Sequence, residues 1–585
     1  MKKKFLLPIF LFFLLSIVFF LSKNNLFLTE NHRFEKFTSR LFASQITSNT
    51  LNLHYTLAYP EQFGIENTPI CLGSLKQENQ EKEFASLENY QKALEGFSFE
   101  KLSRTNQITY DILKLEFSTQ LSGQNFWFLQ EPLRPNLGIQ SQLPVLLAEY
   151  TFRCGKDIKD YFSHLSSLPA YYREILDFEK QKSENGFFMS DSSADRVIAQ
   201  CRAFMEDPSS NYLSSMFQDK IEHLKASDRI TEKQALSYIK LHDKIMKTCV
   251  FPAYETLCQE LEKLKGTGNN PGGLANLPGG TSYYHYLIQM ETGDFRPVEE
   301  IETRLYQQLR QDYQALQTLL KESPHAIEDL HTLSEKKTHM PKEILSYLNQ
   351  IMKKDFPSIS VSDYKVKYVH SSMEEFSSPA FYLTPPADTL SPNTIYINKS
   401  TEISPAELFT TLAHEGFPGH LYQTLYYGNT NPPLIRNLLG CSGYIEGWAT
   451  YAEFLSFRYG ADYLGVSPDL MEFLRLNRCV NLCLYSLLDI GIHFHGWDQA
   501  SVSKTLYSFG ILSQDTCGEI FQYIVENPGN YLKYYVGYLN FTDLRTKAEH
   551  ASKKEFNLKQ FHQQILEIGP APFPVLEKYV MNAWE

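Results

Sequence analysis

The sequence predicts a mainly α-helical fold with one small β-sheet. Apolar residues recur at spacings of three and four among charged residues over most of the chain, which is the pattern of amphipathic helices. Only residues 359–398 alternate in the way of β-strands. The 585 residues are 43% hydrophobic and 14% aromatic, so we expect a large folded core rather than a disordered chain.

The first 22 residues read as a membrane segment. Three lysines precede an apolar run from Phe5 to Ser22, which reaches the lower range of lengths that span a bilayer. Neither small residues of the A-x-A type nor a cysteine follow it, so an uncleaved signal-anchor fits better than a cleaved signal peptide or a lipoprotein signal. We expect residues 23–45 to form a stalk and residues 46–585 to form one large helical domain outside the cytoplasm, anchored at the cell membrane, or secreted if the segment is cleaved.

The overall charge and the cysteines exclude other classes of protein. A net charge of −12 disfavours nucleic acid as the main partner, since that would need a basic face. Nine cysteines scattered over a large chain do not make a disulfide scaffold. Cys479 and Cys483, four residues apart on an expected helix, could form half of a zinc site, but buried free thiols fit them better.

Helical periodicity extends through the segments that precede the β-like stretch. It predicts helices within residues 80–120, 157–185, 192–225, 230–264, 297–322 and 341–354. Residues 266–284, GTGNNPGGLANLPGGTSYY, interrupt this pattern. Their glycines and prolines predict a linker or an ordered lid without regular structure.

A small sheet is predicted just before the central motif of the chain. SPAFYLTPPAD and NTIYINKS read as two short strands joined by a turn. An exposed edge of such a sheet can bind an extended peptide through its backbone. We expect Tyr382, on the first of these strands, to contact a substrate bound in this way.

The central motif is LAHEGFPGHLYQ, residues 412–423. Ser404, Pro405 and Glu407 predict the start of its helix, as an N-cap, a first-turn proline and a capping box. His414 and His420 are six residues apart. On a straight helix this spacing leaves them about 120° apart, and they could not share a metal ion.

The residues after Glu415 change this geometry. Pro418 lacks the amide hydrogen that a helix needs, and the glycines on either side of it permit unusual backbone angles. We therefore expect a kink or a π-type bulge between residues 416 and 420 that brings His420 towards His414. By themselves, the two histidines and Glu415 still fit a chance polar face better than a metal site.

A third ligand is expected 26 residues after His420, at Glu446. Catalytic zinc is usually held by three protein ligands and keeps a fourth position open for water. Glu446 begins an amphipathic helix and shares one face of it with Glu453, which could orient a ligand histidine. The alternative for Glu446 is a carboxylate that merely favours the start of a helix.

Two later segments supply further candidates. Asp489 and His493 are four residues apart on an expected helix, so the aspartate could hold the imidazole while the imidazole donates to a developing oxyanion. A satisfied core histidine explains His493 equally well. Tyr534 could donate to the same oxyanion, and Arg545 could bind a substrate carboxylate, although aromatic packing is the simpler explanation for any one tyrosine in this segment.

Four motifs occur in a fixed order: HEGFPGHLYQ, EGWATYAEF, DIGIHFHGW and YYVGYLNFTDLRTKAE. Together with SPAFYLTPPAD and LPGGTSYY they resemble the bacterial family catalogued as domain of unknown function 885, over roughly residues 45–580. That family is similar to the gluzincin zinc peptidases, in particular the helical group of angiotensin-converting enzyme, thimet oligopeptidase and Taq carboxypeptidase. The resemblance implies a helical, peptidase-like domain with a deep cleft and a small sheet next to the active-site helix.

The resemblance also implies roles for individual residues. His414, His420 and Glu446 match the zinc ligands, and Glu415 matches the catalytic base. Tyr534 matches the tyrosine of the family's Y-x-x-G motif, and His493 matches the histidine that ends its D-x-G-x-H motif. One departure is Tyr485, which stands where many members of the family have an arginine.

The function expected from the sequence is an extracytoplasmic, zinc-dependent peptidase that hydrolyses short peptides through a metal-activated water. The membrane is its second partner, through the N-terminal helix, and nucleic acid is not a partner. Two alternatives remain open. One is an inactive peptide- or solute-binding envelope protein of the same fold. The other is a metal-dependent hydrolase of a non-peptide amide.

Overall fold

The structure is a computed structural model. It describes residues 29–584 except for 209–210, 269, 327–329, 331–332, 334–339, 360–362, 371–373, 375–377, 402 and 553–554. The expected signal-anchor, residues 1–22, lies outside the described residues. Within the described ranges, no helix is both long and apolar enough to cross a membrane.

The segment expected to be a stalk is for the most part a packed helix. Helix α2, Glu30–Ile46, begins at an N-cap, Thr29, and buries Phe34, Leu41 and Phe42 in the main hydrophobic core. Burying three large apolar side chains on one face removes enough apolar surface from water to hold α2 against the main hydrophobic core. Residues 30–45 therefore belong to the folded domain, which corrects the stalk prediction.

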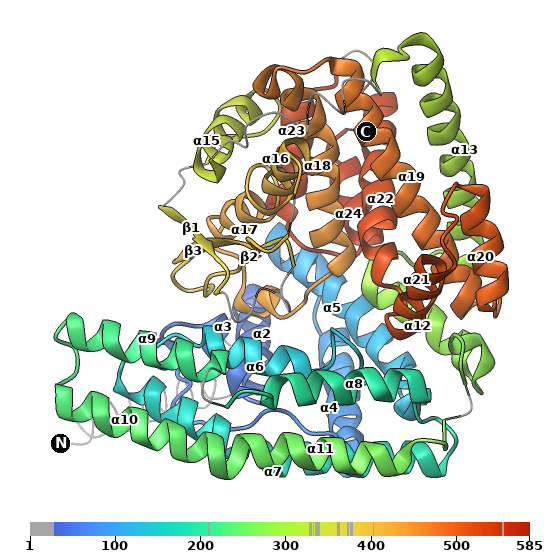
Figure 1. The fold of residues 1–585 in the computed structure, drawn as a ribbon. Helices are drawn as coiled ribbons and strands as arrows, with labels where there is room; N and C mark the ends of the chain where they lie inside the picture. The colour runs from blue at the N-terminus through green and yellow to red at the C-terminus, as the bar shows by residue number, and fades with distance from the viewer. Residues whose placement is uncertain are drawn as a thin grey trace, which may run out of the picture.

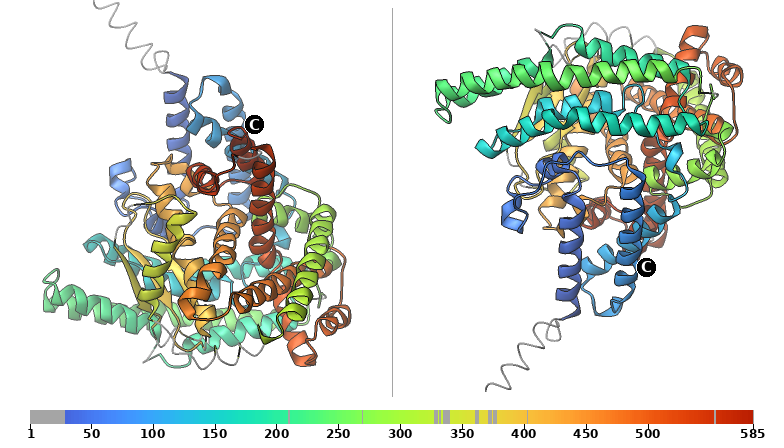
Figure 2. Two further views of the ribbon diagram at one scale, coloured as in Figure 1. Left: turned by 90° about the horizontal axis from the view of Figure 1, so that it is seen from above. Right: turned by 90° about the horizontal axis from the view of Figure 1, so that it is seen from below.

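One layer of the molecule consists of long helices with a hydrophobic core of their own (Figures 1 and 2). These helices are α6 (Ile139–Glu149), α7 (Gly155–Glu184), α8 (Asp191–Met205), α9 (Tyr212–Ala226), α10 (Glu232–Ile245) and α11 (Phe251–Leu264). The sequence predicted helices within residues 192–225 and 230–264. The chain turns between α8 and α9, and a short π-helical segment, Met246–Val250, joins α10 to α11.

The second and larger body holds the motif helices and the main core (Figure 1). Near the N-terminus it takes in α3 (Thr50–Thr56), α4 (Gln77–Glu95) and α5 (Arg104–Ser122). Its middle part has α12 (Gly280–Thr292), α13 (Val298–Glu322), α15 (Pro341–Ile351), α16 (Pro405–Glu415) and α17 (His420–Gly428). The C-terminal part has α18 (Ser442–Leu464), α19 (Pro468–His493), α20 (Gln499–Ser508), α21 (Gln514–Glu526), α22 (Asn530–Ala551), α23 (Leu558–Ile568) and α24 (Phe573–Met581).

Helices α18 and α22 cross unusually closely in this body. A Cβ atom on Gly447 would lie 2.5 Å from the carbonyl carbon of Gly537, and one on Gly537 would lie 2.2 Å from the carbonyl oxygen of Gly443. Both crossing points therefore need glycine. The close approach brings the first turns of the two helices together, and these turns carry Glu446 and Tyr534.

The predicted sheet lies beside the motif helix. Its strands are β1 (Tyr364–Tyr368), β2 (Ala380–Leu383) and β3 (Asn393–Ile397), in the order β1-β3-β2. Strand β3 pairs in parallel with β1 and antiparallel with β2, with Tyr382 opposite Ile395. Strand β2 is therefore an edge strand, and this edge faces α16 (Figure 1).

The loop prediction for residues 266–284 holds only in part. A turn of 3-10 helix forms at Leu274–Asn276, and α12 begins at Gly280. A Cβ atom on Gly280 would lie 1.8 Å from the carbonyl oxygen of Leu274, so this glycine lets the loop fold back on the helix start. The nine cysteines are free thiols in the structure, and Cys479 and Cys483 are buried, as expected for that pair.

Candidate metal centre

The motif helix breaks completely where a kink was expected. Helix α16 is capped by Ser404, whose hydroxyl accepts from the Glu407 amide at 3.2 Å, and it ends at Glu415. Helix α17 begins at His420, after four residues of turn. The Gly419 amide donates back to the carbonyl oxygen of Ala413 at 2.9 Å, which closes the turn.

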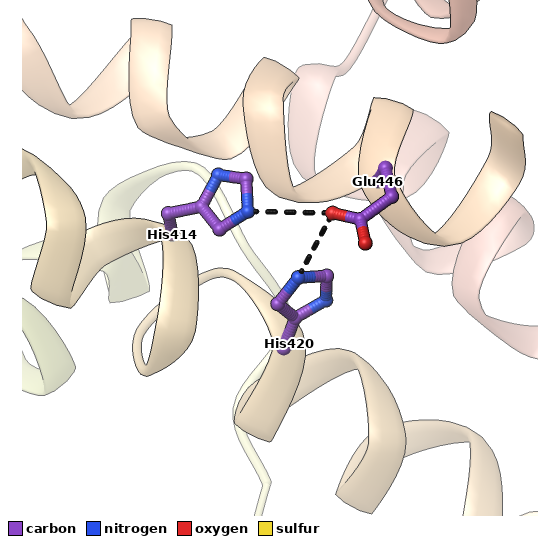
Figure 3. A group of neighbouring side chains, drawn as sticks. All are labelled: His414, His420 and Glu446. Carbon is purple, nitrogen blue, oxygen red and sulfur yellow. Dashed lines mark ion pairs between the residues drawn. The ribbon is translucent and has the colours of Figure 1, made fainter. Parts of the chain in front are cut away.

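Three side chains converge across this break (Figure 3). One carboxylate oxygen of Glu446, Oε2, lies 3.5 Å from Nε2 of His414 and 3.3 Å from Nε2 of His420. The two imidazole rings have centroids 4.8 Å apart and planes at 85°. The histidines come from the end of α16 and the start of α17, and the glutamate from the first turns of α18.

This group fits a zinc ion by its geometry and donors. Zinc binds histidine nitrogen and carboxylate oxygen at about 2.0–2.2 Å, so neighbouring ligand atoms of a tetrahedral site lie roughly 3.3 Å apart. The distances from Glu446 to the two histidines are close to that value. One ligand atom from each residue lies within 4.8 Å of the others, and within the described ranges this is the one group of such residues with metal-binding geometry.

The electrostatics of the group favour a bound cation. Burial disfavours a charged imidazole, but hydrogen bonds to Glu446 and Glu453 raise the pKa of His414 to about 10. Burial also disfavours a charged carboxylate, yet the two histidines hold the pKa of Glu446 far below its usual range. The site thus stabilises a proton strongly, and a metal ion would replace that proton.

Glu453 lies behind His414, on the side away from Glu446. Its Oε2 accepts from Nδ1 of His414 at 3.1 Å, and its Oε1 accepts from Nε of Arg478 at 3.3 Å. A carboxylate in this position fixes the tautomer that leaves Nε2 free for a metal. Sequence reasoning missed Arg478, because its helix, α19, is distant from the motif in the sequence and carries no local signal.

Glu415, the expected base, is held by the sheet. Its Oε2 accepts from the backbone amide of Tyr382 at 2.9 Å. The Tyr382 hydroxyl donates to Oδ1 of Asn393 at 2.6 Å, so the side chain of Tyr382 points into the sheet region rather than to Glu415. The contact between Tyr382 and a substrate stays a prediction.

Tyr534 lies next to the three converging side chains. Its ring centroid is 6.4 Å from that of His414. Burial raises the pKa of its hydroxyl well above the usual value, and the charges of Glu446 and Glu415 raise it further. The hydroxyl therefore stays protonated and can donate a hydrogen bond.

The expected pair of Asp489 and His493 does not form. Asp489 accepts from the Tyr284 hydroxyl at 2.5 Å and from the Gly529 amide at 3.0 Å. Nδ1 of His493 accepts from the Leu274 amide at 3.1 Å, and Nε2 is 2.9 Å from the carbonyl oxygen of Ile524. Both ring nitrogens are used by the backbone, so His493 has no proton to offer an oxyanion, and its role is structural.

Arg545 also lies away from the converging side chains. It is eleven residues after Tyr534 on α22, which is about 16 Å along a helix. Its Nε donates to Glu549 at 2.8 Å, and it interacts with Tyr451. This position does not support the expected contact with a substrate carboxylate.

The sequence matches a family described as bacterial protein of unknown function (DUF885) over residues 62–580. No curated protein matches the chain. A solved structure from Colwellia psychrerythraea is 19% identical, with a TM-score of 0.80 over 95% of this chain and 99% of the other. One from Shewanella oneidensis is 15% identical, with a TM-score of 0.61 over 86% and 93%. Both are described as putative lipoproteins, and at these identities they show the shared fold alone.

A third structure, described as a putative oligoendopeptidase F from Bacillus anthracis, is 8% identical and covers 87% of this chain and 96% of its own, with a TM-score of 0.25. That value is too low to carry an argument. The similarity to gluzincin peptidases and the peptidase-like cleft therefore stay predictions.

Proposed function

We propose that this chain, which belongs to the DUF885 family of bacterial proteins of unknown function, is a zinc-dependent peptidase. The proposal rests on the side chains that the fold brings together. The supporting observation is the convergence of His414, His420 and Glu446 with Glu415 alongside. A ligand set with an adjacent carboxylate base is what hydrolysis by an activated water needs.

His414, His420 and Glu446 would hold the zinc ion. When bound, zinc lowers the pKa of a coordinated water towards ~7 and polarises a carbonyl oxygen. Glu415 accepts the proton of the attacking water and passes it to the leaving amine. The amide of Tyr382 fixes one oxygen of Glu415, so the other is oriented for this transfer.

Tyr534 donates its hydroxyl hydrogen to the oxygen of the reacting carbonyl as negative charge develops there. Its raised pKa keeps that hydrogen in place at neutral pH. A preorganised donor of this kind typically contributes about 10²- to 10³-fold to turnover. The edge of β2, whose Tyr382 amide already points at Glu415, is the natural place for an extended peptide to align.

We further propose that the protein works outside the cytoplasm, at the cell membrane, on short peptides. The three lysines and the apolar run that follows them support export. Two similar structures are described as putative lipoproteins, which agrees with an extracytoplasmic location. A peptide-binding envelope protein without activity is the main rival, and a hydrolase of another amide is the second.

The test compares the full-length chain with His414→Ala and Glu415→Gln in two assays, zinc content and cleavage of a peptide library. We expect about one zinc per chain in the parent and in Glu415→Gln, and none in His414→Ala. Turnover should fall about 10²- to 10⁴-fold in Glu415→Gln. Near-normal turnover of that variant would refute the mechanism. Failure of the parent to bind added zinc would favour the binding protein.

A further inference from the structure

A large cavity opens between the two bodies of the molecule. Its volume is about 840 Å³, within the range of sites that bind small ligands. Helices α4 and α12, the loop that follows α5 and the segment before α22 all contribute to its wall. Apolar side chains dominate this wall, among them Phe126, Leu129, Leu133, Phe187, Tyr283 and Tyr286.

Two elements lead from this cavity to the metal centre. Pro528 lines the cavity just before α22, and Tyr534 lies four residues into that helix, about 6 Å along its axis from Asn530. Glu291 lines it from α12, and the next residue, Thr292, packs against Gly443, one turn before Glu446. Because an extended chain advances about 3.3–3.6 Å per residue, we expect two or three peptide residues to reach from the cavity to the metal centre.

The cavity wall carries charged groups of both signs: Lys82, Glu83, Glu131, Arg134, Glu291 and Glu526. Glu131 is paired with the buried Lys182, and Glu526 lies 3.0 Å from Arg196. Glu291 packs beside Gly529, at the start of α22, where a helix favours negative charge.

Arg134 also lines the cavity, and its guanidinium has no hydrogen bond or ion pair with any residue that the structure describes. Its charge acts on Tyr283 and Tyr523 and also on Glu131, which lines the same cavity. Burial raises the pKa of both hydroxyls, and the charge of Arg134 opposes that rise. An unpaired guanidinium in an aromatic cavity matches a carboxylate by both charge and shape.

Building on the proposed function, we infer that this cavity binds the carboxyl-terminal residues of a peptide, with the terminal carboxylate on Arg134. The aromatic wall would take apolar side chains of those residues. The substrates are then short peptides with a free and apolar carboxyl end, cut two or three residues from that end. This inference names the substrate class, which the metal centre alone leaves open.

The experiment measures binding without cleavage. Full-length, zinc-loaded Glu415→Gln protein is titrated calorimetrically with the peptide Ala-Ala-Phe, once as the free acid and once as the amide. We expect the acid to bind at least about 10-fold more tightly, as for a charge-assisted two-point contact. Equal binding of the two peptides would overturn the inference.

Substitutions in the same background locate the effect. Arg134→Gln should abolish the preference for the acid, and Arg134→Lys should keep part of it, because a lysine retains the charge but not the planar fork. Arg202→Gln on the exposed side of α8 is the matched control and should keep the full preference. Melting temperatures show whether each variant is folded. If Arg134→Gln fails to fold, a partial loss of the preference for the acid in Arg134→Lys supports the inference, and an unchanged preference contradicts it. A full preference in a folded Arg134→Gln protein contradicts the inference.

This design separates the inference from the proposed function. If the acid is preferred and the preference depends on Arg134, the inference stands even when the parent cleaves nothing, and only the peptidase proposal fails. If the parent cleaves acid and amide peptides at equal rates, the peptidase stands and the role of Arg134 is refuted.

Discussion

Replacing Gly419 by alanine should destroy the metal centre without touching a ligand. A Cβ atom at this position would lie 1.7 Å from the carbonyl oxygen of His414 and 2.5 Å from that of Ala413. The closest ordinary approach of carbon to oxygen is about 3.3 Å, so residue 419 must move by roughly 1.6 Å. Neither obstacle can yield easily, because both oxygens belong to the backbone of the motif helix.

The displacement passes directly to His420, the next residue. Its Nε2 is 3.3 Å from Glu446, and zinc–ligand bonds tolerate only about ±0.2 Å. We therefore expect zinc affinity to fall by at least about 100-fold, the upper end of the loss seen when groups outside the ligand set are removed. Peptide cleavage should fall in parallel.

The assay is zinc competition against a chromophoric chelator, with circular dichroism to check the helical content. Gly440→Ala is the matched control, because a Cβ atom there meets nothing within 4 Å, and it should bind zinc like the parent. An unchanged affinity in Gly419→Ala would show that the break between the helices does not position His420.

Three further outcomes are expected. Glu453→Gln should weaken zinc binding about 10- to 100-fold, because Nδ1 of His414 loses its anionic acceptor; an unchanged Kd contradicts this. Tyr534→Phe should lower kcat about 10²- to 10³-fold with zinc content intact. A rise in KM with unchanged kcat would contradict a role at the oxyanion. Burial lowers the pKa of His164 and of His242 to about 4, so the unfolded chain binds protons below pH 6.5 that the folded chain does not. Stability should therefore fall by about 1.4 kcal/mol per histidine for each pH unit from 6.5 towards 4, and His164→Phe should reduce the slope measured by urea unfolding at pH 7.0 and 5.5.

The sequence predicted the convergence of His414, His420 and Glu446 better than it predicted where the helices begin and end. The signals for this site are local, and each acts within one or two turns of its own position. They are the spacing of the two histidines, the helix cap at Ser404 and the glycines around Pro418. The predicted kink was a complete break because tertiary contacts, such as the bond from the Trp448 indole to the carbonyl oxygen of Pro418, stabilise two separate helices.

Other predictions failed where only the folded chain decides the partner. Asp489 and His493 share a helix face, but Tyr284 and Gly529 from distant segments reach the aspartate first. Residues 23–45 were expected to form a stalk because they are polar and aromatic, but the apolar side chains of α2 lie on one face of the helix. The sequence alone does not reveal the surface against which that face packs.

The strongest argument for a metal rests on how His414 is oriented. Glu446 and Glu453 are seven residues apart on α18, about 10.5 Å along its axis, and the imidazole of His414 lies between them. Glu453 is an anionic acceptor, so it takes the hydrogen of Nδ1 and turns the lone pair of Nε2 towards Glu446 and His420. A peptide-binding protein would have no use for a fixed tautomer whose lone pair faces a second histidine and a carboxylate. A metal ligand requires that orientation, and the loss of zinc affinity in Glu453→Gln tests whether the protein depends on it.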